Sequence, residues 1–204
     1  NTLKFTFMFS FLLATLSIII SFICLLPLTS RTFKNGQLPW AGVLATTFGL
    51  STGITSLYML AIGLIPGAWL RPLLVLPIPW LLLGFCIWKT RRMPEPLARS
   101  GNQLVFWLTI ICIGGFAVIT VNSVSYPFYR YDVLARFAPN ARLLFDSQSV
   151  PSALTGYPLG VQMLYTYAFM AYGAVNDHLA GIFVAAFSGA MLLTTFAIGR
   201  IAFS

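Results

Sequence analysis

The chain has 204 residues, of which 58% are hydrophobic and only 8% are charged, and its mean hydropathy is +0.87. These values exclude a soluble domain with a wetted surface and indicate an integral membrane protein. The formal net charge of +8 does not indicate a nucleic-acid partner, because the twelve Lys and Arg residues are scattered at the ends of apolar runs instead of collecting on one face.

Long apolar runs along the chain predict helices that cross a membrane. A helical span needs about 20 apolar residues to cross about 30 Å of hydrocarbon, and these runs lack the alternation of a barrel strand. The qualifying runs are Phe5 to Leu28, Ala41 to Ile65, Leu73 to Trp88, Leu104 to Val124, and Leu179 to Phe203. The sequence therefore predicts an all-α polytopic membrane protein with about five transmembrane helices.

The connection between the third and fourth runs sets the expected orientation. It carries Lys89, Arg91, Arg92 and Arg99 against the single acidic residue Glu95, and cytoplasmic loops are enriched in Lys and Arg. With this connection in the cytoplasm, the residues after the fourth run emerge on the extracytoplasmic face. We therefore expect a four-helix transmembrane region (1–123), an extracytoplasmic loop (124–178) and a final transmembrane helix (179–204). Because the chain starts without methionine and stops close to the last run, we also expect that a longer polypeptide has been truncated.

Two juxtamembrane amphipathic helices are predicted within the loop of residues 124–178. The apolar residues from Tyr131 to Leu144 have helical spacing, and Pro139 should kink or split this helix. The segment from Tyr157 to Val175 either spans the bilayer or lies flat at its surface. Its four tyrosines, and the rule that places Arg200 in the cytoplasm, favour the surface.

The same loop holds three of the four acidic residues and the single histidine, His178. Asp132 suits either a pair with a neighbouring arginine or a general base at the mouth of a cavity. Asp146 is either a solvated turn residue or a second carboxylate of the site. Asp177, after Asn176 and before an apolar helix, is typical of a helix N-cap. One histidine does not support a metal site, and we expect no metal and no cofactor.

Three arginines flank these acids: Arg130, Arg136 and Arg142. The planar guanidinium fork suits a phosphate or diphosphate group. Contact with the headgroups of membrane lipids is an equally open interpretation.

Three short motifs follow one another in the second half of the chain. They are Y-D-x-L-A-x-x-A-P-x-A-R from Tyr131, G-Y-P-L from Gly156 and N-D-H-L-A from Asn176, with an apolar helix ending in I-G-R. This order resembles the first outer loop and following span of the GT-C membrane glycosyltransferases, closest to the bacterial relatives of the protein mannosyltransferases and of the lipid A aminoarabinose transferases. The resemblance covers about residues 120–204.

The resemblance implies a function and a set of site residues. Asp132 matches the presumed catalytic base of the family, and Tyr157 matches the element that opens the second juxtamembrane helix. The implied reaction is transfer of a sugar from a polyprenyl-phosphate donor to an acceptor on the extracytoplasmic face, in the bacterial inner membrane. With Asp132 as base, the expected residues for substrate and phosphate are Arg130, Arg136, Arg142, Asp146 and Tyr157.

Two departures from the family leave a second interpretation open. The family commonly has one span before this loop, whereas four apolar runs precede it here, and the family's donor-site residues usually lie in helices that follow this region. The abundant glycine, including Gly114 and Gly115, permits close approach of helices. The alternative is a non-catalytic subunit that packs against other membrane subunits in a larger complex.

Overall fold

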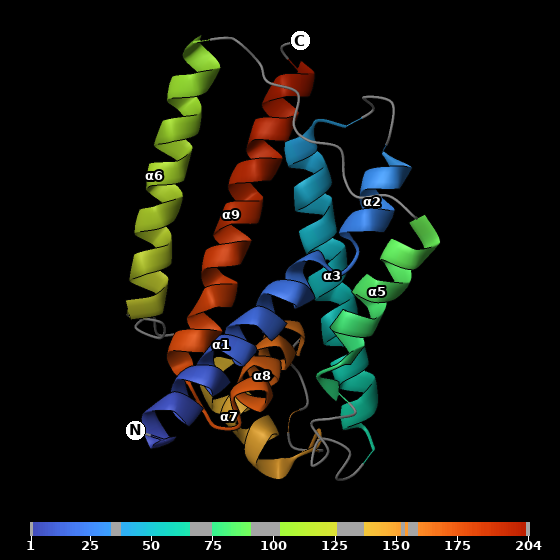
Figure 1. Cartoon of the computed structure of the whole chain (residues 1–204), viewed down its shortest axis with the longest axis vertical. Coiled ribbons are helices and arrows are strands. Elements are labelled where there is room, and N and C mark those ends of the chain that lie inside the picture. Colours follow the sequence, from blue (N-terminus) through green and yellow to red (C-terminus); the bar gives the residue numbers. More distant parts are fainter. Residues whose placement is uncertain are drawn as a thin grey trace.

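The computed structural model of the protein describes residues 2–33, 38–65, 75–90, 103–125, 137–151, 154 and 159–202. The described residues form helices and no strand, so the prediction of an all-α protein is confirmed (Figure 1). The helices are α1 (Thr2–Ile23), α2 (Leu26–Thr32), α3 (Trp40–Gly63), α5 (Ile78–Thr90), α6 (Gln103–Ser125), α7 (Ala138–Ser147), α8 (Gly160–Tyr172) and α9 (Asp177–Ala202).

Three helical segments of the described chain are long and apolar enough to cross a membrane. They are Ser10–Thr32, which joins most of α1 to α2, Trp40–Gly63 (α3) and Asp177–Ala202 (α9). The apolar helices Ile78–Thr90 (α5) and Ile110–Ser125, within α6, are shorter. The helices α3 and α9 coincide with two of the predicted spans to within two residues at each end. Because three segments of the described residues meet the requirement for crossing, the expected number of five spans stays a prediction.

The first apolar run is not one continuous helix, because it breaks between α1 and α2. Pro27 stands in the first turn of α2, where its missing N–H costs little. The Leu25 N–H at the break donates to Oγ of Ser51 on α3 over 3.2 Å. The hydroxyls of Thr29 and Thr47 lie 2.5 Å apart and add a second link between α2 and α3. Hydroxyl groups of α3 therefore supply hydrogen bonds that a hydrocarbon environment cannot offer.

The hydrophobic core is built around α8. Nine consecutive residues of this helix, Gln162 to Met170, are buried, and α1, α3, α7 and α9 pack against it. The largest fully buried side chains of the protein include Tyr167, Phe169 and Phe183, from α8 and α9. A helix therefore forms within the predicted segment, but these nine residues lack the exposed face of an amphipathic surface helix. Its expected position at the membrane surface stays a prediction.

The shorter helix α7 has the amphipathic character that the sequence predicts. Ala138, Ala141 and Leu144 are buried, while Arg142 and Asp146 are exposed. Pro139 stands in the first turn of α7, which agrees with the expectation that a helix is split at this proline. Residues 131–136 lie outside the described part of the chain.

The helix α6 lies at the edge of the bundle beside α9 (Figure 1). Its residues 110–118 are all exposed. A β-carbon placed on Gly189 of α9 would lie 2.7 Å from Cε2 of Phe116, so the phenyl ring of α6 occupies the space left by the glycine. This contact allows the two helices to approach closely.

Candidate functional site

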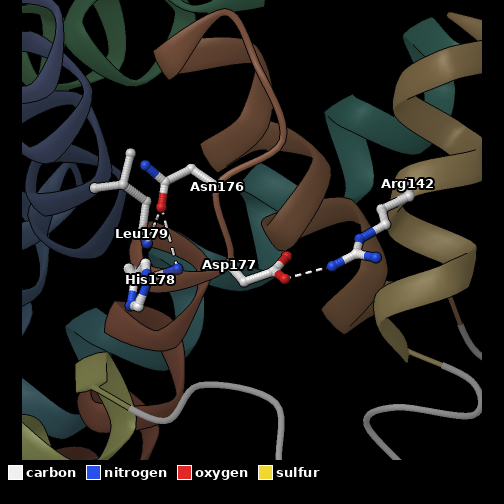
Figure 2. A network of polar contacts seen from close by, with 5 residues as sticks. All are labelled: Arg142, Asn176, Asp177, His178 and Leu179. Atoms are coloured by element: carbon white, nitrogen blue, oxygen red, sulfur yellow. Dashed lines mark hydrogen bonds and ion pairs between the residues drawn. The ribbon is translucent and has the colours of Figure 1, made fainter. Parts of the chain in front are cut away.

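The end of α6 and the start of α9 lie at one end of the bundle (Figure 1). A cluster of polar side chains connects them to each other and to α7. Figure 2 shows Arg142 of α7 opposite Asp177 of α9, with Asn176 and His178 on either side of Asp177 in the chain. All four residues were noted in the sequence: Arg142 as a candidate phosphate-binding residue, Asn176 and Asp177 as a helix start, and His178 as the single histidine. The contact between Arg142 and Asp177 was not predicted.

Asn176 caps the N-terminus of α9. Its Oδ1 accepts hydrogen bonds from the N–H groups of His178 (3.1 Å) and Leu179 (3.2 Å) (Figure 2). The first turn of a helix has N–H groups without partners in the helix, and a side-chain oxygen at this position satisfies them. The predicted helix start is therefore confirmed, but the capping side chain is that of Asn176, one residue before the expected Asp177, which is the first residue of α9.

Asp177 lies in the first turn of α9 and forms an ion pair with the Arg142 guanidinium. The positive end of the helix dipole favours a carboxylate at this position. The side chain of Arg142 is 48% exposed and that of Asp177 is 28% exposed. One carboxylate oxygen, Oδ2, accepts from Arg142 Nη2, while the other, Oδ1, is buried and has no hydrogen-bond partner within the described residues. The ion pair joins α7 to α9 and leaves one acceptor unused.

His178, also in the first turn of α9, connects this helix to the end of α6. Its Nδ1 lies 2.5 Å from the carbonyl oxygen of Val124. Because a carbonyl can only accept, Nδ1 carries the hydrogen and donates it, which leaves Nε2 as the acceptor of the neutral ring. The start of α9 is thus fixed to α6 by His178 and to α7 by Asp177.

A second set of polar groups lies inside the core on α8, and the sequence did not reveal it. Thr166 Oγ1 donates to the carbonyl oxygens of Gln162 (2.9 Å) and Ala141 (3.3 Å), and Tyr167 Oη donates to the Ser17 carbonyl oxygen over 3.4 Å. The side-chain amide of Gln162 is fully buried. These residues are uncharged and stand in an apolar run, so no charge or motif marked them.

Burial changes the acidity of the tyrosines of α8. It raises the pKa of Tyr165 to about 12 and also raises the pKa of Tyr167, because an apolar environment disfavours the phenolate. Both hydroxyls therefore stay protonated throughout the physiological range, and they act as hydrogen-bonding groups, not as bases.

The predicted site residues fall into two groups. Arg142 and Asp146 are described, and both are exposed on α7. They are four residues apart and share one side of the helix, yet Arg142 pairs with Asp177. The other predicted residues lie outside the described part of the chain: Arg130, Asp132, Arg136 and Tyr157.

The described side chains define what this cluster can do chemically. Among the described residues no group of three or more His, Cys, Asp or Glu side chains could hold a metal ion. The cluster offers an exposed guanidinium, a carboxylate with one unused oxygen and an imidazole nitrogen. Such groups bind polar ligands by charge and hydrogen bonds.

Comparison of the chain with protein-family models, with curated proteins and with solved structures found no match.

Proposed function

We propose that this chain is part of a membrane glycosyltransferase, which transfers a sugar from a polyprenyl-phosphate donor to an acceptor on the extracytoplasmic face of the bacterial inner membrane. The supporting observation is the Arg142–Asp177 pair, in which α7 and the start of α9 bring together an arginine and an acid. Both residues belong to the motifs that resemble the outer loop of the GT-C family. The partners of the protein are then membrane lipids and the lipid-linked donor, with no cofactor.

Asp132 serves as the general base of this reaction. It takes the proton of the acceptor hydroxyl as the hydroxyl oxygen forms a bond to the anomeric carbon of the sugar. The bond from that carbon to the phosphate oxygen breaks, and the electron pair leaves with the phosphate. Cations stabilise the negative charge of the departing group, and Arg130 and Arg136 supply them. Asp146 and Tyr157 bind the substrates by hydrogen bonds.

Arg142 has a more restricted role, because its guanidinium already contacts a carboxylate. It can bind a phosphate oxygen only when it exchanges Asp177 for the ligand or uses its remaining N–H groups. The exposure of the pair permits this exchange.

A transfer assay with the variant Asp132→Asn tests the proposal. The protein is reconstituted in liposomes, and incorporation of a labelled sugar from a polyprenyl-phosphate donor into lipid or protein acceptors is followed. We expect the variant to lose transfer while its expression and helical content stay unchanged. The control variant Glu95→Gln removes the acid of the basic connection and should keep full transfer. Wild-type turnover by Asp132→Asn would eliminate Asp132 as the base.

A second candidate function is a non-catalytic subunit of a larger membrane complex, and the exposed face of α6 favours it. β-Carbons placed on Gly114 and Gly115 would meet no atom within 4 Å, so another helix can approach the backbone there. Stable co-purification with a membrane protein, together with absence of sugar transfer by the wild-type chain, would support the subunit over the enzyme.

A further inference from the structure

The side-chain amide of Gln162 is a polar group that the core of the protein leaves unsatisfied. The residue is 0% exposed, and within the described chain neither Nε2 nor Oε1 has a hydrogen-bond partner. A buried amide without partners lowers the stability of the folded state, and such groups are rare in native proteins. A partner that arrives from outside the chain would explain why an amide stands here.

The position of Gln162 on α8 indicates which helix covers it. Gln162 precedes Thr166 by four residues, so the two side chains lie on one side of α8. Thr166 Oγ1 donates to the carbonyl oxygen of Ala141 in α7. That side of α8 therefore faces α7, and α7 is the element whose movement would open a path to the amide.

The contacts that hold α7 in place are limited. Its buried face consists of two alanines and one leucine: Ala138, Ala141 and Leu144. Phe145 adds a ring contact with Phe169, and the link to α9 is the partly exposed Arg142–Asp177 ion pair. Exposed ion pairs contribute little to stability and are weakened by salt, so this pair attaches α7 to α9 only weakly. Further links are the packing of α7 on α8 and the hydrogen bond that the Val150 N–H, after α7, donates to the Gly63 carbonyl oxygen of α3 over 2.8 Å.

We propose that α7 is a lid over Gln162, and that the amide binds a hydroxyl-rich ligand of the sugar class when the lid lifts. A carboxamide offers both donors and an acceptor, and a hydroxyl group also both donates and accepts. A phosphate ion chiefly accepts and an ammonium group only donates, so neither satisfies both ends of the amide. The identity of the ligand rests on the proposed function, whereas the opening of α7 does not.

Thiol labelling tests the opening. Gln162→Cys is placed in a chain whose exposed Cys112 is replaced by serine, while Cys24 and Cys86 are buried and serve as internal references. We expect a water-soluble maleimide to label the introduced thiol slowly in the folded protein. Removing the ion pair with Arg142→Gln should raise the labelling rate about 1.5- to 5-fold, the factor that an exposed ion pair contributes to an equilibrium.

The matched control is Asp146→Asn, which changes an exposed charge of α7 outside the ion pair and should leave the labelling rate unchanged. If the introduced thiol stays unlabelled with and without Arg142, the amide is sealed and the lid is refuted. Hydrogen exchange of the α7 backbone tests the opening without an introduced cysteine. We expect faster exchange in Arg142→Gln than in the wild type. Equal exchange in the two proteins would also refute the lid.

Ligand binding is tested on the wild type and on Gln162→Met, a side chain of similar length without an amide. The probes are the methyl glycosides of glucose and mannose, followed by saturation-transfer NMR on protein in nanodiscs, with inorganic phosphate as competitor. We expect a signal from at least one glycoside with the wild type, insensitive to phosphate and lost with Gln162→Met, whose melting temperature should not fall. A signal that survives in Gln162→Met, or no signal from the wild type, would overturn the assignment. If the wild type failed to transfer sugar from the lipid-linked donor, the proposed function would be refuted, whereas the opening of α7 is decided by the labelling and exchange experiments.

Discussion

Replacing Gly189 by alanine should weaken the contact between α6 and α9, because a β-carbon there would lie 2.7 Å from Cε2 and 3.2 Å from Cδ2 of Phe116. The shorter distance is at least about 0.8 Å below the separation of about 3.5–4.0 Å that is optimal for two carbon atoms. Overpacking of a tight contact costs about 1–3 kcal/mol, against a gain of about 1 kcal/mol from replacing a glycine in a helix by alanine. We therefore expect a net loss of up to about 2 kcal/mol in the free energy of unfolding.

The matched control lies on the same helix. A β-carbon at Gly199 would meet no atom within 4 Å, so Gly199→Ala should keep or raise stability. Unfolding of the purified protein by a denaturing detergent, followed by tryptophan fluorescence, measures both variants. In a Phe116→Ala background, Gly189→Ala should behave like Gly199→Ala, because the ring is gone. If Gly189→Ala and Gly199→Ala were equally stable with Phe116 present, the close packing of α6 on α9 would be refuted.

Three further perturbations can be followed by the same unfolding assay. Asn176→Ala removes the cap of α9 and should cost about 1 kcal/mol; an unchanged midpoint would mean that the cap contributes nothing. Ser51→Ala deprives the Leu25 N–H of its acceptor and should cost about 1–3 kcal/mol, whereas no loss would show that another acceptor replaces Ser51. Burial raises the pKa of Tyr165 to about 12, while an unfolded tyrosine ionises near pH 10. Stability that is fully present below pH 10 should therefore fall by about 2–3 kcal/mol as the pH rises toward 12. Tyr165→Phe should reduce this fall, and an equal fall in the variant would contradict the assignment to Tyr165.

Local features of the sequence predicted most of the helical segments and one end of the candidate site. The runs that became α3 and α9 were identified to within two residues, because helix formation depends on local hydrogen bonds and on the length of the apolar segment. Asn176 was recognised as part of a helix start for the same reason, since a cap involves residues adjacent in the chain. The helical spacing of apolar residues also predicted that Ala141 and Leu144 of α7 are buried, although it did not include the buried Ala138.

The sequence did not predict which side chains pair with one another in the folded protein. Arg142 and Asp146 have the spacing of a helical ion pair, but the structure pairs Arg142 with Asp177, which is far along the chain. Gln162 is a polar residue in an apolar run, which indicates a position turned away from lipid, but the sequence does not tell which helices cover it or whether its amide has a partner.

The sequence by itself determined that this protein is helical and apolar enough for a membrane, and where several of its helices begin and end. Only the tertiary structure decided that α8 is the centre of the core, with Gln162 to Met170 buried among the neighbouring helices. The physical reason is that membrane hydrocarbon and a protein interior both accept apolar side chains, so the composition of a helix does not tell which of the two surrounds it. Packing among distant segments makes that decision, as when Phe116 of α6 fills the space above Gly189 of α9.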